Sequence, residues 1–204
     1  APADIYYARE LGYRIKHLGI AKQESDALQL RVHPTLIPET KAIAQVDGVL
    51  NAVMINASGV GELLLVGPGA GSRPTASAVM ADVVSVARSL ARNEQPCIHS
   101  MGVGIGAMSQ PVIADINKVS SAWYLRLDAE DKPGVMAALT QVLSRHDIGI
   151  ESVIQKPDSA VLAKVPVILL TDQAPTRAIE QAIADIEALP SVCGFVTCLR
   201  VEKF

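Results

Sequence analysis

The order of hydrophobic patterns in the second half of the chain restricts its fold more than any other feature. Runs at 123–128, 148–155, 165–171 and 192–201 have the length and pattern of strands. Helical spacing separates the first run from the second and the third from the fourth, at Val135, Leu139, Val142 and Leu143, and at Ile179, Ile183 and Ile186. This order predicts a ferredoxin-like βαββαβ sandwich with four antiparallel strands and both helices on one face.

The first half also mixes helices and strands, so the whole chain is expected to be an α+β protein. We expect a helix over 4–11 that ends at Gly12, strands at 13–21 and 28–32, and a loop marked by Pro34 and Pro38. A hairpin over 49–56 and 62–66 and a long helix over 74–92 complete this half. Residues 93–117 are rich in glycine and proline without a sustained period, which predicts three regions, 1–93, a linker at 94–119, and 120–204.

Composition excludes several classes of function. The 204 residues carry a net charge of −3 without a basic cluster, which argues against a nucleic-acid partner. No apolar run approaches the roughly 20 residues that a membrane span needs. Cys97, Cys193 and Cys198 are an odd set without a Cys-x-x-Cys pair, and the four histidines are scattered. We therefore expect a cytoplasmic protein with no membrane contact, disulfide framework or metal site.

A glycine cluster at the start of the long helix is the first candidate binding feature. Gly67, Gly69 and Gly71 follow the apolar run 62–66, and a helical stripe follows them, at Val79, Val83, Val86 and Leu90. Glycines at such a junction let a ligand approach the backbone, and the N–H groups of the helix start favour an anion. The alternative is a tight strand-to-helix turn that binds nothing.

Neither common phosphate-binding motif matches this junction. A P-loop needs Lys and Ser or Thr after its last glycine, whereas Ser72 and Arg73 follow Gly71. A dinucleotide fingerprint that began at Gly69 would need glycine where Pro74 stands. The junction is therefore not the main pyrophosphate site, although it remains able to touch a nucleotide.

The loop from Asp128 to Gly134 is the second candidate binding feature, because it joins the first strand of the second half to its helix. Pro133 and Gly134 start the helix and leave main-chain donors free for a carboxylate. Asp128 and Asp131 would meet an ammonium group, so the loop suits a free amino acid. Simple helix capping by Asp131 is the alternative.

Together these residues resemble homoserine dehydrogenase in the form that carries a C-terminal ACT domain. The likeness covers nearly the whole chain apart from the linker. In the first half the matching runs are 10–16, 18–22, 31–38, 46–49, 51–53, 69–71 and 74–79. In the second half they are Asp131-Lys-Pro-Gly-Val135 and Ile150-Glu-Ser-Val-Ile-Gln-Lys156.

The resemblance implies an NAD- or NADP-dependent oxidoreductase that interconverts L-homoserine and L-aspartate 4-semialdehyde on the route to threonine, methionine and isoleucine. It also implies that the Rossmann domain and the catalytic lysine lie outside this chain. Lys16 and Lys22 do not match the catalytic motif, so we expect no catalytic residue here and an inactive fragment. The chain would be the end of the substrate domain, with a mixed sheet and helices, followed by an ACT regulatory domain.

The resemblance also implies two sets of site residues. Gly71 is the expected cofactor contact, with weaker contacts at its neighbours Gly69, Ala70 and Thr75. A regulatory amino acid, expected to be threonine, would bind in the ACT domain at Asp128, Asp131, Gly134 and Gln155. Because the edge strands of an ACT sheet are exposed, we expect a homodimer or higher homo-oligomer. The alternative function is a non-catalytic ACT module for amino-acid sensing or assembly.

Overall fold

The computed structural model describes residues 1–24, 26–92, 106, 108–155 and 164–204. Two compact units divide the chain. The first unit comprises 1–40 and 112–204, and the second comprises 41–111. The first unit contains α1 (Pro2–Glu10), β1 (Tyr13–Glu24), β2 (Ala27–Pro38), β5 (Val112–Ile113), η3 (Ile116–Lys118), β6 (Ser120–Glu130), α3 (Val135–Arg145), β7 (Ile150–Gln155), β8 (Lys164–Thr171), β9 (Ala174–Pro175), α4 (Thr176–Glu187) and β10 (Val192–Val201).

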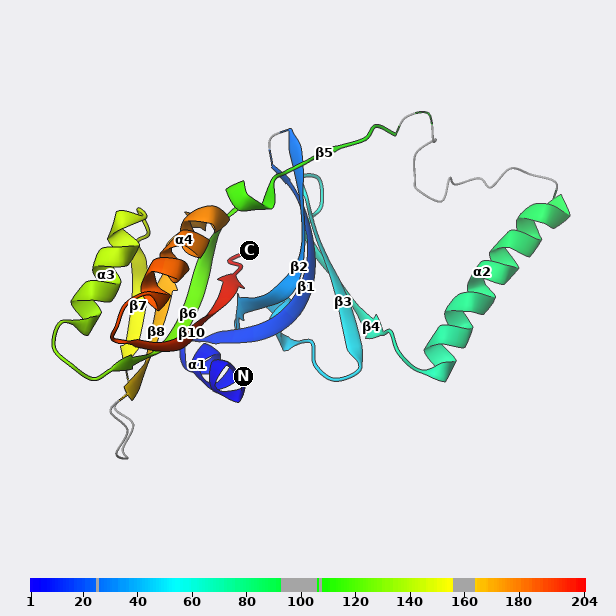
Figure 1. The fold of residues 1–204 in the computed structure, drawn as a ribbon. Coiled ribbons are helices and arrows are strands. Elements are labelled where there is room, and N and C mark those ends of the chain that lie inside the picture. The colour runs from blue at the N-terminus through cyan, green and yellow to red at the C-terminus, as the bar shows by residue number, and fades with distance from the viewer. Residues whose placement is uncertain (25, 93–105, 107, 156–163) are drawn as a thin grey trace. The chain divides into compact units, whose positions relative to one another are not determined.

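The predicted βαββαβ sandwich is confirmed. Strands β10, β6, β8 and β7 lie in this order in one sheet and pair antiparallel. Both α3 and α4 lie on the same face of these strands (Figure 1). The core between helices and sheet includes Leu125, Leu127, Leu139, Leu143, Leu169, Ile179 and Ile186, each at most 1% exposed. The helical stripes of the sequence therefore point into the core, as their spacing predicts.

The sheet does not end at β10, because the β1–β2 hairpin extends it. Strand β2 pairs in parallel with β10, where Thr35 faces Arg200 and Leu36 faces Val201. Helix α1 and β1 contribute to a second core on the face opposite α3 and α4, which contains Ala8, Tyr13, Leu36, Ala122, Tyr124, Ile168, Leu170 and Val201. Helix α1 and the start of β1 thus pack on the helix-free face of the C-terminal sheet.

A buried carboxylate ties α1 to that sheet. Asp4 is 2% exposed and accepts hydrogen bonds from Arg126 Nε at 2.6 Å and from the Tyr124 hydroxyl at 3.2 Å. Burial alone would raise the pKa of Asp4, but the hydrogen bonds from Arg126 and the Ala1 nitrogen, with the Arg126 charge, bring it below its ordinary value. The carboxylate is therefore ionised in the folded chain at neutral pH.

The second unit contains η1 (Ala42–Gln45), β3 (Leu50–Ala57), β4 (Gly61–Pro68) and α2 (Ser72–Arg92). The predicted hairpin is confirmed, since β3 and β4 pair antiparallel from Leu50 opposite Pro68 to Ala57 opposite Gly61. The predicted long helix is confirmed as α2, which begins two residues before Pro74. The apolar stripe of α2 is exposed, at Val79, Val83, Val86 and Leu90.

One predicted loop is wrong. Pro34 and Pro38 lie inside β2, which runs without interruption to Pro38. On the side of β2 away from β1, β10 pairs at Thr35 and Leu36 and β5 at Ala27 and Leu28. Pro34 and Pro38 therefore lie outside these paired positions, where a missing N–H donor is tolerated. Strand β1 pairs with β2 along its whole length and continues to Glu24, beyond the predicted end at Ala21.

The region boundaries at 94 and 119 stay a prediction. Much of the predicted linker, including the glycines at 102 and 104, lies outside the described residues, and so does Cys97. Among the described helices, none combines the length and the apolar character that crossing a membrane requires.

Candidate functional site

The clearest candidate site is a pocket of about 330 Å³ at the start of α3. The loop before α3 forms one wall, through Glu130, Asp131, Lys132, Pro133 and Gly134. The first residues of α3 and the neighbouring strands complete it, through Val135, Met136, Gln155, Val165 and Val167. This volume lies at the lower end of the range for small-molecule sites, so the pocket suits a ligand the size of an amino acid.

Three of the four predicted ligand residues line this pocket, namely Asp131, Gly134 and Gln155. Asp128 is not among the lining residues. It is exposed, and it alternates along β6 with Leu127 and Ala129, whose side chains enter the core under α3 and α4. Asp128 therefore lies on the opposite face of β6.

At the start of α3 the Val135 N–H donates to the Lys132 carbonyl of the loop at 3.3 Å, and no side chain caps the N–H groups that follow. Gly134 is the N-cap residue, with a φ of 92°, and no side chain caps the helix. The capping alternative for Asp131 is therefore wrong. Gly134 needs to be glycine because other residues rarely adopt this left-handed conformation. Uncapped N–H groups at a helix start attract a carboxylate, while Glu130 and Asp131 at the loop offer negative charge to an ammonium group.

Sequence reasoning missed the side walls of this pocket. Lys132 forms an ion pair with Glu130 at 3.0 Å, and Val135 and Val167 line the pocket while also belonging to the core beneath it. The charged pair is visible in the loop sequence, but the contribution of β8 depends on strand pairing that the local sequence does not reveal.

The second predicted site, the glycine junction, forms an exposed turn between β4 and α2. Gly71 has a φ of 125°, and its carbonyl accepts a hydrogen bond from the Thr75 N–H at 3.1 Å. A Cβ at Gly69 would meet the end of the Asn51 side chain of β3, which is exposed and can rotate away. Ala70 and Thr75 are exposed. The turn brings the four predicted residues together, and its glycines also serve the local backbone.

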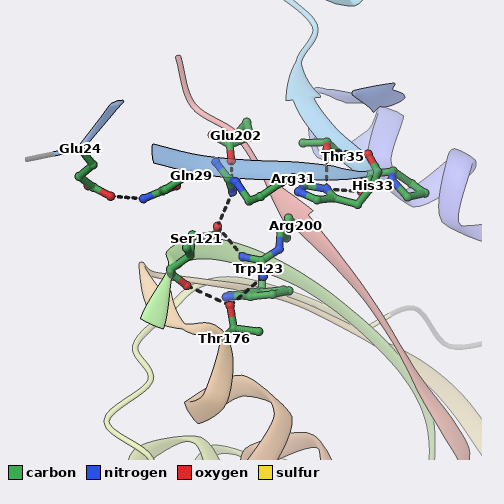
Figure 2. Close-up of polar contacts among 12 residues, drawn as sticks. Glu24, Gln29, Arg31, His33, Thr35, Ser121, Trp123, Thr176, Arg200 and Glu202 are labelled. Atoms are coloured by element: carbon green, nitrogen blue, oxygen red, sulfur yellow. Dashed lines mark hydrogen bonds and ion pairs between the residues drawn. The ribbon is translucent and has the colours of Figure 1, made fainter. Parts of the chain in front are cut away.

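A third feature, which sequence reasoning did not find, is a buried polar cluster between β2 and the C-terminal sheet (Figure 2). Arg31 and Arg200 are 6% and 7% exposed. Their Nη1 atoms both donate to Ser121 Oγ, at 3.2 Å from Arg31 and 2.9 Å from Arg200. Arg31 also pairs with Glu202 at 2.6 Å. We call Arg31, Ser121, Thr176, Arg200 and Glu202 the arginine cluster.

The arginine cluster also reaches α4 and the hydrophobic core. Arg200 Nη2 donates to the hydroxyl of Thr176, the first residue of α4, at 2.7 Å. The Arg200 guanidinium lies 4.2 Å from the centroid of the Trp123 ring, a cation–π contact. Burial, followed by repulsion from Arg31, lowers the pKa of Arg200 from its ordinary value. Two cations thus share one hydroxyl, and Glu202 pairs directly with one of them, Arg31.

Next to the arginine cluster, His33 lies on the same face of β2. Its Nδ1 is 2.9 Å from Thr35 Oγ1, whereas His33 Nε2 and Arg31 Nε are buried without a hydrogen-bond partner among the described residues. Burial, with repulsion from Arg200 and Arg31, lowers the pKa of His33. In the described part of the chain, no group of three or more His, Cys, Asp or Glu residues is placed to hold a metal ion.

Comparison with known proteins matches the two parts of the chain to two families. The homoserine dehydrogenase family model matches residues 1–84, and the ACT domain model matches residues 123–188. The arginine cluster joins Arg31 of the first match to Thr176 of the second.

Individual relatives agree along almost the whole chain. A homoserine dehydrogenase from Pseudomonas aeruginosa is 45% identical over 98% of this chain, and one from Neisseria gonorrhoeae is 40% identical over 98%. The crystal structure of a homoserine dehydrogenase from Thiobacillus denitrificans superposes with a TM-score of 0.87 at 43% identity, over 98% of this chain. The chain spans 46% of the length of each of the two sequence relatives and 45% of the solved chain. The chain is therefore similar to homoserine dehydrogenases over almost its whole length, and it contains a segment that matches the ACT domain model.

Proposed function

We propose that the whole protein to which this chain belongs is an NAD- or NADP-dependent homoserine dehydrogenase. It would interconvert L-homoserine and L-aspartate 4-semialdehyde in threonine, methionine and isoleucine biosynthesis. The proposal is supported by relatives of this name that are up to 45% identical over nearly all of this chain. The chain itself would carry no catalytic residue, so residues 1–204 alone would be inactive.

Within that enzyme, we propose that the turn between β4 and α2 forms part of the cofactor wall. The cofactor would approach the main chain of the turn, because Gly71 has a positive φ and the turn residues are exposed. Gly71 would allow close approach, with Gly69, Ala70 and Thr75 beside it. The nicotinamide cofactor, held mainly by segments outside this chain, would supply the redox chemistry. The residues of this turn would only bind and orient it.

We further propose that the pocket at α3 is a regulatory site for threonine. The observation that supports this is that Asp131, Gln155 and the start of α3, which has no side-chain cap, line one pocket. The N–H groups would bind the carboxylate of the amino acid and Asp131 its ammonium group. Gln155 would contact the threonine hydroxyl.

Calorimetric titration of threonine into residues 1–204 tests this site. The whole chain is needed, because residues from α1, β1 and β2 complete one face of the C-terminal sheet. Asp131→Asn removes the charge in the pocket, and Asp128→Asn makes the same change on the opposite face of β6. Losing a charged partner costs about 1.5–3 kcal/mol, so we expect about ten- to a hundredfold weaker binding for Asp131→Asn only.

Two results would count against this assignment. Equal weakening by Asp128→Asn would mean a general charge effect instead of a site at the pocket. No heat and no thermal shift with millimolar threonine, isoleucine or methionine would leave the ACT domain as a pairing module. That alternative function, assembly without ligand, fits β7, which is the last strand on its side of the sheet.

We propose that the protein forms at least a homodimer, with an edge such as β7 protected by pairing. Light scattering of the intact protein would give its molar mass in solution. A monomer at micromolar concentration would contradict this assembly, but it would leave the assignment of the catalytic activity unaffected.

A further inference from the structure

The arginine cluster is the polar part of the connection between β2 and the C-terminal sheet. The main-chain connection of β2 with the β10 segment is short: Thr35 pairs with Arg200, Leu36 pairs with Val201, and the Glu202 N–H donates to the Leu36 carbonyl at 3.0 Å. The side chains add a longer path from α4 through Thr176, Arg200, Ser121 and Arg31 to Glu202. Its members come from four segments that lie far apart in sequence (Figure 2).

Arg200 occupies the middle of this path. Each of its terminal nitrogens holds a different hydroxyl, Ser121 on β6 and Thr176 on α4. The Thr176 hydroxyl is already committed, because it donates to the Val119 carbonyl at 3.0 Å. Hydrogen bonds weaken steeply when their distance or angle changes, so a displacement of the α4 start must move the guanidinium or break its bond.

The cluster is poorly balanced in charge. Arg31 and Arg200 repel each other, and only Glu202 makes a direct ion pair, at 2.6 Å from Arg31. The shared Ser121 hydroxyl holds the two guanidinium groups together. A movement of Arg200 therefore changes the position that is most favourable for Arg31, and with it the placement of β2.

The pocket at α3 contacts the same core as the cluster. Val135 and Val167 line the pocket and belong to the core that includes Trp123 and Ile179 of α4. Because such interiors are close-packed, any shift of Val135 or Val167 on ligand binding is passed on to their core neighbours. The Trp123 ring stacks with Arg200, and its Nε1 donates to the Ala174 carbonyl at 3.2 Å, just before α4.

From this geometry we propose that Arg200 is a positioning residue that couples an occupied pocket at α3 to strand β2, through Thr176, Ser121 and Arg31. The proposal rests on the proposed function, in which the pocket binds an amino acid and β2 belongs to the catalytic part of the enzyme. Arg200 touches neither ligand nor cofactor; it transmits a displacement.

The first experiment uses the whole enzyme and compares Arg200→Lys with the wild type. Lysine keeps the charge but cannot hold both hydroxyls as the guanidinium fork does. Arg177→Lys, an exposed change on α4, is the matched control. We expect Arg200→Lys to bind threonine within about threefold of wild type when homoserine is absent, and to lose at least a fivefold effect of threonine on the homoserine KM. If Arg200→Lys binds threonine as the wild type does and threonine still changes the homoserine KM to the same extent, the proposal is overturned.

The second experiment needs no ligand and therefore separates failure of the coupling from failure of the threonine site. In residues 1–204, Thr176→Val removes the hydroxyl that Arg200 holds, and Thr140→Val on α3 is the control. We expect amide hydrogen exchange across 29–35 of β2 to become at least about threefold faster with Thr176→Val. When Arg200→Met is already present, Thr176→Val should not increase the amide exchange rate of β2 further, because the path is already broken. No change in β2, or the same change in both backgrounds, would overturn the proposal.

Discussion

Asp4→Asn tests the contact between α1 and the C-terminal sheet. Asp4 is 2% exposed and accepts hydrogen bonds from Arg126 Nε at 2.6 Å, from Arg126 Nη2 at 3.3 Å and from Tyr124 at 3.2 Å. Breaking a fully buried ion pair costs about 3–5 kcal/mol. The Arg126 side chain is 18% exposed and also donates to Thr197, so it keeps some compensation. We therefore expect a loss of about 2–3 kcal/mol in unfolding free energy.

The same substitution should also change how the free energy of unfolding depends on pH in acid. Because the pKa of Asp4 is lowered in the fold, its ionised form stabilises the chain at all pH values above the ordinary carboxyl pKa. This contribution disappears as pH falls through the folded pKa, where the carboxylate takes up a proton. The stability difference between wild type and Asp4→Asn should therefore be constant from pH 7 to about 5 and shrink below about pH 4.

Urea unfolding followed by the fluorescence of Trp123, the single tryptophan, measures both effects. Asp185→Asn is the matched control, since Asp185 pairs with His146 at 2.8 Å but its side chain is 53% exposed. Exposed pairs contribute about 0–1 kcal/mol. A cost for Asp4→Asn no larger than for Asp185→Asn, or a difference from wild type that does not shrink in acid, would refute the reasoning.

Three further predictions follow from burial and geometry. Leu139→Ala, at a fully buried position, should cost about 2–5 kcal/mol in urea unfolding, whereas Leu65→Ala, at a position 64% exposed, should stay within about 0.5 kcal/mol; equal costs would contradict the assigned core. Burial lowers the pKa of His33, so stability that depends on neutral His33 should be lost as pH falls below about 6.5, and His33→Gln should remove that part of the pH dependence. In the whole enzyme, Ala70→Val should raise the cofactor KM without the backbone strain that a branched residue meets at Gly71, while Gly67→Ala, whose added Cβ meets open space, should not; equal KM values would favour a purely structural turn.

The hydrophobic periodicity of the sequence predicted helices and strands well where an apolar stripe packs against the next element along the chain. The stripes of α3 and α4 and the β3–β4 hairpin are examples, because their periodicity is set by neighbouring residues. The same logic fails at β2. Arg31, which alternates with Leu30 and Val32, is 6% exposed, and the local alternation does not predict this burial.

The reason for the burial of Arg31 is long-range pairing. Arg31 is buried because Ser121 and Glu202 supply its partners, and no local pattern connects residues so distant in sequence. The pocket at α3 shows the intermediate case. The loop through Asp131 and Gly134 was predicted from sequence, but the exclusion of Asp128 and the contributions of Val165 and Val167 depend on how β6 and β8 pair.

Homoserine oxidation by the intact protein is the most direct test of the account. Purified full-length protein, supplied with homoserine and either NAD⁺ or NADP⁺, is followed by the absorbance of the reduced cofactor, beside residues 1–204 under the same conditions. We expect homoserine-dependent reduction by the full-length protein and none by residues 1–204, because the proposed function places the chemistry in segments beyond this chain. Reduction by residues 1–204 alone, or none by the full-length protein with either cofactor, would contradict the account.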